Sequence, residues 1–204
     1  MQLVLGTRNR KKGLELAEFL APLRIDVRTL EDFSDAVEIE EDGETFAANA
    51  AKKAVEQAQQ LGQWVLGEDS GLVVDALGGA PGIYSARYAR PNASDAENNR
   101  RLLKELGDVP LAERTAHYVC HAALADPNGA IRATAEGRCD GRIIFQPRGA
   151  AGFGYDPLFE IPQYGKTFGE LGQPVKSAIS HRAQALRDLI PKIERLIRSG
   201  EWKG

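Results

Sequence analysis

The spacing of apolar residues predicts alternating strands and helices in the first third of the chain. Residues 3–5 form a short apolar run that stops at a Gly-Thr pair, which predicts a strand followed by a loop. Apolar positions recur at helical spacing over residues 14–20, and residues 25–30 offer a second strand. Thr45 can cap a helix with an alanine-rich stripe, and Gly62 can end it. This order indicates an α/β protein.

The middle of the chain combines short strands with one further helix. Residues 64–66 and 72–74 look like two strand pieces separated by an acidic segment. Ser94 and Glu97 have the spacing of a capping box and open a helix that ends at Gly107. We expect the acidic segment to lie on a loop between the two strand pieces.

The last third predicts a hairpin and a long terminal helix. Residues 115–125 and 130–139 are extended runs joined by an Asp-Pro-Asn-Gly turn, so the sheet is expected to be mixed. Residues 141–144 offer another strand. Ser180 caps the final helix, which we expect Pro191 to kink or restart. We therefore predict one α/β domain over residues 1–204, with two lobes around a shared sheet.

Composition narrows the class of protein. Of the 204 residues, 43% are hydrophobic and 27% charged, which argues against intrinsic disorder and a disulfide-stapled miniprotein. The formal net charge of −3 argues against a protein that coats nucleic acid polymers or anionic lipid. No uncharged run approaches the ~20 residues that span a bilayer, and the amino-terminal run is too short for a signal peptide. We expect no membrane partner.

The cysteines point to a reducing compartment. Cys120 and Cys139 are the two cysteines of the chain, and they lack the C-x-x-C spacing of a zinc or redox site. We expect both to be small core residues in a cytoplasmic protein. His117 and His121 share a strand face but have no third ligand at suggestive spacing, so we interpret them as structural.

Basic residues stand at the start of two predicted helices, where the helix dipole disfavours cations by roughly 0.3–1 kcal/mol each. The predicted first helix begins with Arg8, Arg10, Lys11 and Lys12. A phosphate bound by the loop would offset the cost, although a solvated basic face explains the cluster as well. His181 and Arg182 repeat the pattern after Lys176. The alternative explanation is that His181 is an ordinary surface residue and Arg182 pairs with a nearby carboxylate such as Asp188.

Carboxylates and aromatic residues complete the candidate chemistry. Residues 40–42 and the pair Glu68-Asp69 supply oxygens of the kind that Mg²⁺ binds beside substrate phosphates. A solubilising loop is the alternative for the acidic run. Phe153 and Tyr155 lie in a glycine-rich loop with Asp156, where aromatic faces can stack a base. A hydrophobic plug under the loop is equally compatible with this fragment.

Six stretches in this order resemble the inosine/xanthosine triphosphate pyrophosphatase family. They are Thr7-x-Asn9-x-x-Lys12, Glu40-x-x-Gly43-x-Thr45-Phe46, Asp69-Ser70-Gly71-Leu72, Leu77-Gly78-Gly79-Ala80-Pro81-Gly82 with Ser85-Ala86-Arg87-Tyr88, Gly152-Phe153-Gly154-Tyr155-Asp156-Pro157, and Ser180-His181-Arg182 followed by Ala185-Leu186.

The resemblance implies a homodimeric, Mg²⁺-dependent cytoplasmic enzyme. Its fold would be an elongated mixed β-sheet flanked by helices, with two lobes around a central cleft. It would hydrolyse the deaminated purine nucleoside triphosphates ITP, dITP and XTP to the monophosphate and pyrophosphate. Three alternatives remain open at this point: a pyrophosphatase for pyrimidine or modified triphosphates, a regulatory module that binds nucleotides without turnover, and a phosphatase that releases orthophosphate.

The resemblance also assigns site residues. The triphosphate would be held by Thr7, Arg8, Asn9, Arg10, Lys11, Lys12 and Lys53. Glu40 and Asp69 would bind the metal, with Asp69 also the general base. Nucleotide contacts would come from Ser70, Phe153, Gly154, Tyr155, Asp156, Lys176, His181 and Arg182.

This chain departs from the family pattern in two places. The family usually has glycine at the position of Arg8 and often a small residue near Lys11, so the loop here carries extra positive charge. The family often has glutamate at the position of Ala48, where it would complete a capping box with Thr45. We expect that loss to cost helix stability of order 0.5–1 kcal/mol rather than activity.

Overall fold

The computed structural model describes residues 1–37 and 39–202 and contains one mixed sheet with the strand order β2-β1-β3-β4-β5-β6-β7. The strands are β1 (Gln2–Leu5), β2 (Asp26–Thr29), β3 (Val65–Val74), β4 (Thr115–Ala125), β5 (Ile131–Ile143), β6 (Phe159–Ile161) and β7 (Lys166–Thr167). β1 pairs in parallel with β2 and β3, whereas β5–β6 and β6–β7 are antiparallel. The predicted α/β class and mixed sheet are confirmed.

Five α-helices accompany the sheet within the described residues: α1 (Arg10–Leu20), α2 (Phe46–Leu61), α3 (Asp95–Leu106), α4 (Phe168–Ile179) and α5 (His181–Arg198). Short 3₁₀ turns occupy Ala21–Leu23, Leu30–Asp32, Asp75–Leu77, Gly82–Arg87 and Leu111–Glu113. No helix in this part of the chain has the length and hydrophobicity needed to cross a bilayer.

The chain divides into two compact units. Unit 1 comprises residues 1–69, 120–137 and 184–204, and unit 2 comprises residues 70–119 and 138–183. Strands β3, β4 and β5 and helix α5 contribute residues to both. The single domain, elongated outline and central cleft expected from the sequence stay predictions.

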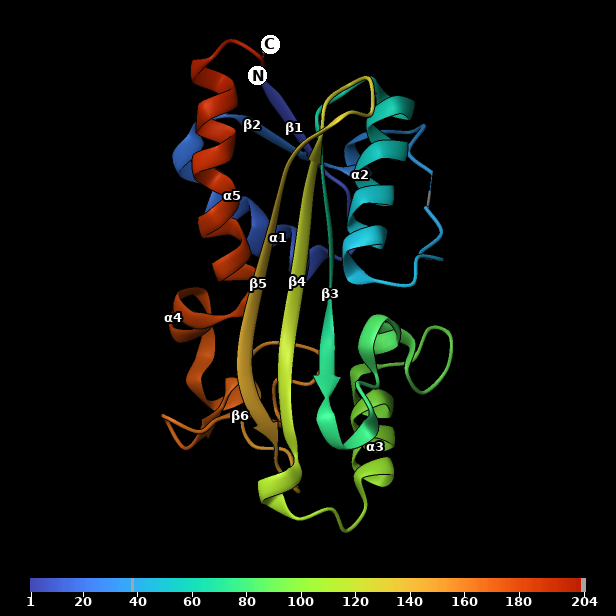
Figure 1. The fold of residues 1–204 in the computed structure, drawn as a ribbon, viewed down its shortest axis with the longest axis vertical. Helices are drawn as coiled ribbons and strands as arrows, with labels where there is room; N and C mark the ends of the chain where they lie inside the picture. The colour runs from blue at the N-terminus through green and yellow to red at the C-terminus, as the bar shows by residue number, and fades with distance from the viewer. Residues whose placement is uncertain (38, 203–204) are drawn as a thin grey trace. The chain divides into compact units, whose positions relative to one another are not determined.

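Unit 1 has helices on both faces of its strands. Leu3 and Leu5 of β1 belong to one buried cluster with residues of α1 and α5, such as Leu16 and Leu189. Val4, between them, belongs to a second cluster with alanines of α2. This alternation follows from the two-residue period of a strand, and it places α2 and α5 on opposite sides of the strands (Figure 1).

Unit 2 is built around one aromatic-rich cluster. Tyr118 of β4 packs against Phe159 of β6, with ring centroids 4.6 Å apart, and Phe159 stacks on Phe168 of α4 at 5.4 Å. Leu102 and Leu106 of α3 join the same cluster. These apolar contacts bring the glycine-rich loop and the start of α5 to a common core.

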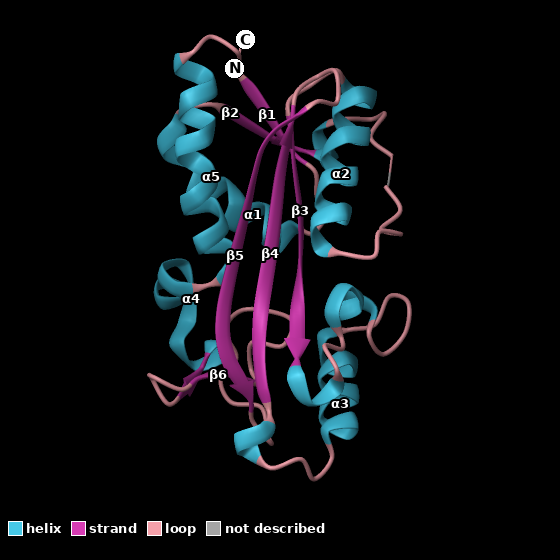
Figure 2. Cartoon of the chain, viewed as in Figure 1, coloured by secondary structure: helices cyan, strands magenta, loops and turns pink. Residues whose placement is uncertain are grey.

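Most helix ends occur where the sequence predicts them. Thr45 caps α2 by accepting a hydrogen bond from the amide of Ala48 at 3.1 Å, and Gly62 ends it at φ 62°. The Ser94–Glu97 capping box forms at α3, and Ser180 Oγ accepts from the amide of Ala183 at 3.2 Å. The turn at residues 126–129 joins β4 to β5 as predicted (Figure 2).

Three local predictions are wrong. The two strand pieces and the acidic segment between them form the continuous strand β3, so Glu68 and Asp69 lie within a strand rather than on a loop. β5 continues through residues 141–143 instead of ending before another strand. The first helix starts at Arg10, leaving Arg8 in the loop. Helix α5 includes Pro191, and the kink expected there stays a prediction. Pairing with neighbouring strands and packing outweighed the local turn signals.

Gly67 lets α2 pack closely on β3. A Cβ atom at Gly67 would collide with the carbonyl oxygen of Ala50 and lie 2.7 Å from the amide nitrogen of Ala54. A strand glycine is otherwise unfavourable, because it has no side chain to pack. The close approach explains why glycine suits this position.

Gly67→Ala should therefore lower the free energy of unfolding by about 1–3 kcal/mol, because a methyl group there displaces α2. Urea unfolding measures the change. Gly13→Ala is the matched control: Gly13 lies inside α1 with its nearest neighbour 4.0 Å from an added Cβ. It should raise stability by about 0.5–1 kcal/mol, since alanine favours a helix. Equal effects of the two substitutions would contradict the packing argument.

Candidate active site

The loop between β1 and α1 is held by its own side chains. Asn9 caps α1, its Oδ1 accepting hydrogen bonds from the amides of Lys11 at 3.1 Å and Lys12 at 3.2 Å. Thr7 Oγ1 accepts from the amide of Asn9 at 3.1 Å. Arg10 and Lys11 are exposed at the first turn of the helix. The loop thus presents positive charge at a helix amino terminus, as an anion site requires.

Arg8 connects this loop to another segment. Its Nη2 donates a hydrogen bond of 2.7 Å to the carbonyl oxygen of Ala36. The segment around Ala36 precedes the acidic residues 40–42 in the chain. Arg8 therefore ties the basic loop to the segment around Ala36, a role that its charge alone did not suggest.

The adjacent carboxylates Glu68 and Asp69 point to opposite faces of β3. Glu68 is 1% exposed, accepts from Lys12 Nζ of α1 at 3.0 Å and from Cys120 Sγ of β4 at 3.3 Å. Asp69 is directed instead toward α2, on the same face as Gly67. The two acids therefore have different partners.

Asp69 lies in a polar cluster supplied by α2. It is 5% exposed, and its Oδ2 accepts from Asn49 Nδ2 at 3.1 Å. Lys53 Nζ, one helical turn further along, lies 3.4 Å from Asp69 Oδ1 and 2.6 Å from Glu41 Oε1. One ammonium group therefore bridges two carboxylates.

Burial sets the direction of the pKa shift at Asp69 but not at Lys53. It raises the pKa of Asp69, an effect that the charges of Lys53 and Lys12 oppose but do not cancel. Burial by itself would lower the pKa of Lys53, but Asp69 and Glu41 outweigh it and the pKa of the ammonium is raised. Lys53 thus stays charged, and Asp69 is a stronger base than an exposed aspartate.

The structure brings Glu41, rather than Glu40, into this cluster. Glu40 is exposed, and its charge helps to raise the pKa of Lys52 in α2. The metal role of Glu40 stays a prediction. Sequence reasoning missed Glu41, Asn49 and Cys120 as neighbours of the carboxylates. The buried side of α2 offered a signal, because Asn49 and Lys53 interrupt its alanine stripe at a spacing of four.

Unit 2 gathers a second group of buried charges around the glycine-rich loop. Asp156 is 2% exposed, and its Oδ2 accepts from Lys176 Nζ at 2.7 Å and from the amide of Phe153 at 2.8 Å. The Lys176 ammonium lies 4.1 Å from the centroid of the Phe153 ring. The ion pair therefore fixes the loop that carries Phe153.

His181 and Arg182 join this group from the start of α5. Arg182 is 1% exposed, donates from Nη2 to Ser70 Oγ at 3.1 Å, and lies 5.9 Å from the Phe153 ring centroid. His181 stacks on Tyr118 with ring centroids 4.7 Å apart. The predicted residues Ser70, Phe153, Asp156, Lys176, His181 and Arg182 are thus brought together.

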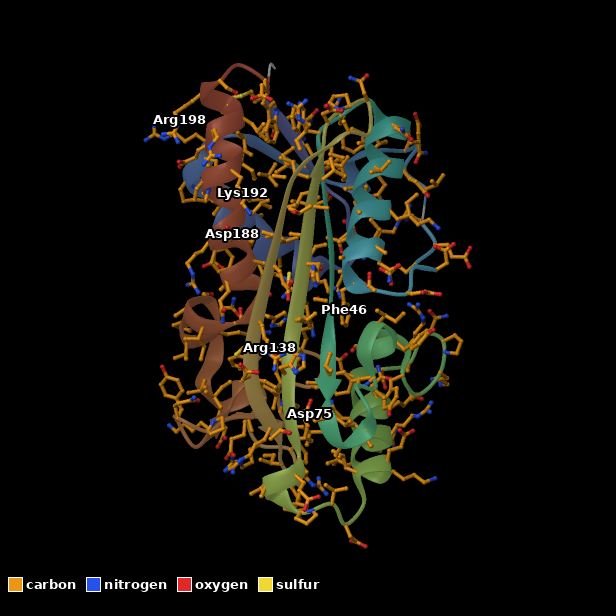
Figure 3. The ribbon with its side chains drawn as sticks, viewed as in Figure 1. Phe46, Asp75, Arg138, Asp188, Lys192 and Arg198 are labelled. Carbon is orange, nitrogen blue, oxygen red and sulfur yellow. The ribbon has the colours of Figure 1, made fainter. Side chains whose placement is uncertain are left out.

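Asp188 is not the partner that the alternative explanation gave to Arg182. It forms an ion pair of 2.7 Å with Lys192, one turn further along α5 (Figure 3). Arg182 is instead nearly inaccessible to solvent and faces the glycine-rich loop. The Asp188–Lys192 ion pair on α5 is therefore separate from the contacts of Arg182 at the start of the helix.

Tyr155 and Gly154 form hydrogen bonds with other residues of unit 2. The hydroxyl of Tyr155 donates to the carbonyl oxygen of Ser85 at 2.8 Å, and its ring belongs to the buried cluster. The amide of Gly154 donates to Asp95 Oδ2 at 2.8 Å. Tyr155 thus has the plug role that the sequence left open. Direct contacts of either residue with a nucleotide stay predictions.

The remaining candidates behave as structural residues. His121 Nε2 lies 3.6 Å from a carboxylate oxygen of Glu136, and its ring stacks on Phe46. Cys120 and Cys139 are buried thiols, as expected. Across the described residues, no three or more His, Cys, Asp and Glu side chains are arranged to hold a metal ion.

Comparisons with known proteins agree with this geometry. A sequence profile of the Ham1 family matches residues 3–192. The chain is 56% identical to a "dITP/XTP pyrophosphatase" of Rhodopirellula baltica over 97% of this chain and 95% of the relative. A protein of the same name from Desulforamulus reducens is 50% identical over 96% and 97%.

Solved structures show the same likeness in three dimensions. A HAM1 protein from Coxiella burnetii superimposes with a TM-score of 0.87 at 40% identity, covering 96% of this chain and 99% of that one. A nucleoside-triphosphatase / dITP/XTP pyrophosphatase from Mycobacterium abscessus gives 0.76 at 38% identity, covering 95% and 100%. These matches confirm the resemblance seen in the sequence, and the chain belongs to the Ham1 family.

Proposed function

We propose that the protein hydrolyses the deaminated purine nucleoside triphosphates ITP, dITP and XTP to the monophosphate and pyrophosphate. The names of relatives that are 46–56% identical support this activity. The observation that carries the chemistry is the buried Asp69 carboxylate, which Asn49 and Lys53 hold from α2. A base held in this way beside several cations suits hydrolysis of a polyanion.

A divalent cation fits the donor set of unit 1. Asp69 and Glu41 direct carboxylate oxygens at the same ammonium group, so they already share one cation. Mg²⁺ in nucleotide enzymes is typically held by one or two carboxylates together with substrate phosphates. We assign Asp69 and Glu41 as its protein ligands, with Glu40 a further candidate. Bound there, Mg²⁺ would neutralise phosphate charge.

The residues of unit 1 act on the triphosphate and on water. Lys12, Lys53 and the basic residues of the β1–α1 loop neutralise the phosphates, and Asp69 accepts a proton from the attacking water. The water oxygen bonds to the α-phosphorus while the α–β anhydride bond breaks, and pyrophosphate leaves with its charge compensated. Oδ1 of Asp69 faces the cation, and Oδ2, which Asn49 orients through one lone pair, accepts the proton through the other. Positioning and charge neutralisation thus supply most of the catalysis.

The residues of unit 2 recognise the base. Phe153 provides a face for stacking, and Arg182 donates to the 6-oxo oxygen of hypoxanthine or xanthine. Adenine has an amino donor at that position, so two donors would oppose each other without an acceptor. The guanidinium is positioned by its hydrogen bond of 3.1 Å from Nη2 to Ser70 Oγ. We further propose that the protein is a homodimer. Its cytoplasmic location stays a prediction.

Incubation with ITP and Mg²⁺ should release IMP and pyrophosphate, because the attack is at the α-phosphorus. Chromatography of the nucleotide product and separate assays of pyrophosphate and orthophosphate identify the reaction. GTP, dTTP and UTP under the same conditions test the base preference. Orthophosphate as the primary product, or faster turnover of a pyrimidine nucleotide, would contradict the proposal.

Asp69→Asn should reduce kcat by at least about a hundredfold, since the amide cannot accept the proton. Burial raises the pKa of Asp69, so the fold favours its protonated form. The stability associated with that shift is present at low pH and is lost as the pH rises through the folded-state pKa. At neutral pH the asparagine variant should therefore unfold at no lower urea concentration than the wild type.

The matched control is Asp188→Asn on the surface of α5, which should leave kcat and the urea midpoint unchanged. Its ion pair with Lys192 is exposed to solvent. Wild-type kcat in the Asp69→Asn protein would remove Asp69 from the mechanism.

Arg182→Ala should lower the ratio of kcat/KM for ITP to kcat/KM for ATP by about ten- to a hundredfold, because the donor that rejects the 6-amino group is lost. The ratio is independent of the fraction of folded enzyme, so any loss of stability does not affect it. Arg198→Ala, at an exposed position near the end of α5, is the control. An unchanged ratio would place base recognition elsewhere.

A further inference from the structure

We propose that the Lys53 ammonium occupies the position of the divalent cation in the nucleotide-free protein, so that the metal binds tightly only together with the nucleotide. The proposal rests on the metal-dependent function above and adds an order of binding to it. Lys53 is then more than a phosphate ligand. Its ammonium group must move away from the two carboxylates when the nucleotide binds.

The geometry that carries this inference is a bridge between two carboxylates. Lys53 Nζ lies 2.6 Å from Glu41 Oε1 and 3.4 Å from Asp69 Oδ1, oxygens that belong to separate segments of unit 1. The Lys53 and Asp69 side chains are 10% and 6% exposed. A divalent cation held by both carboxylates would use the same two oxygens that already contact the ammonium. The two cations therefore compete for one place.

Charge makes the competition unequal without the substrate. Asp69 and Glu41 carry two negative charges that Lys53 partly neutralises, and Glu68 is already paired with Lys12. A divalent ion that entered would face a nearby ammonium in a poorly hydrated site, where repulsion between like charges is strong. A triphosphate brings negative charge of its own, which gives Lys53 a new partner and leaves both carboxylates to the metal.

The local structure allows the ammonium to move while its helix stays fixed. Close packing at Gly67 holds α2 on β3, so the backbone of Lys53 has little freedom. The lysine side chain is a flexible four-carbon stem that can redirect its charge. Asn49 donates to the other oxygen of Asp69, which keeps that carboxylate in place during the exchange.

The neighbouring residue provides a matched control. Lys52 lies on the same helix and forms an ion pair of 2.5 Å with Asp42, whose side chain is 58% exposed. Its removal changes the net charge by the same amount as removal of Lys53. It leaves the Asp69 and Glu41 bridge untouched. Lys52 interacts with Asp42 and Glu40 instead, so a gain confined to Lys53→Met is specific to the bridge between Asp69 and Glu41.

The test is binding of Mn²⁺ to the nucleotide-free, full-length protein, measured by electron paramagnetic resonance. Wild type should bind Mn²⁺ weakly, Lys53→Met at least about tenfold more tightly, and Lys52→Met within about twofold of wild type. Lys53→Arg retains a cation and should bind as weakly as wild type. Tight binding to the wild type, or no gain in Lys53→Met, would overturn the proposal.

Two further measurements locate the effect and confirm folding. Adding Asp69→Asn to Lys53→Met should abolish the gain in Mn²⁺ affinity; a gain that survives would overturn the proposal. α,β-Methylene ITP should increase the Mn²⁺ affinity of the wild type by a larger factor than that of Lys53→Met, and equal factors would contradict it. Circular dichroism of each variant shows that it is folded. These readouts need no turnover, so they are distinct from failure of the wild type to release pyrophosphate from ITP.

Discussion

The close contact between helix α2 and strand β3 at Gly67 is the constraint on which the chemistry of unit 1 depends. Ala50 and Ala54 pack against the strand where it has no side chain. Asn49 and Lys53 each precede one of these alanines, and Asp69 shares a strand face with Gly67, two residues away. The helix and strand periodicities therefore bring an amide, an ammonium and a carboxylate together once the backbones are close.

Glu68 and Asp69 point to opposite faces of β3 and therefore contact different helices. Glu68 meets Lys12 of α1, and Asp69 meets Lys53 of α2. Each carboxylate is nearly inaccessible to solvent, and burying an unpaired charge would cost several kcal/mol. The lysines offset that cost, and in doing so they place positive charge beside the residue that we assign as the base.

Unit 2 also contains buried charged residues, and there they surround an aromatic side chain. The buried pair Asp156–Lys176 and the buried Arg182 surround Phe153, so a stacking surface is bordered by hydrogen-bond donors. Buried ion pairs add little net stability compared with apolar packing. Their concentration at residues that the family resemblance assigned to the nucleotide favours a functional origin. Tyr118 links this group to the aromatic core through its stack with His181.

Local sequence determined most helices and strands of this protein and the kinds of side chain in its candidate site. Apolar periodicity, the caps at Thr45 and Ser94, and the turn at residues 126–129 each depend on neighbours in the chain, so the sequence alone predicted them. Tertiary structure decided that Glu41 rather than Glu40 meets Lys53, that β3 continues through Glu68 and Asp69, and that Arg182 faces Phe153. These outcomes depend on backbone approach and strand pairing between distant segments, and no local spacing encodes them.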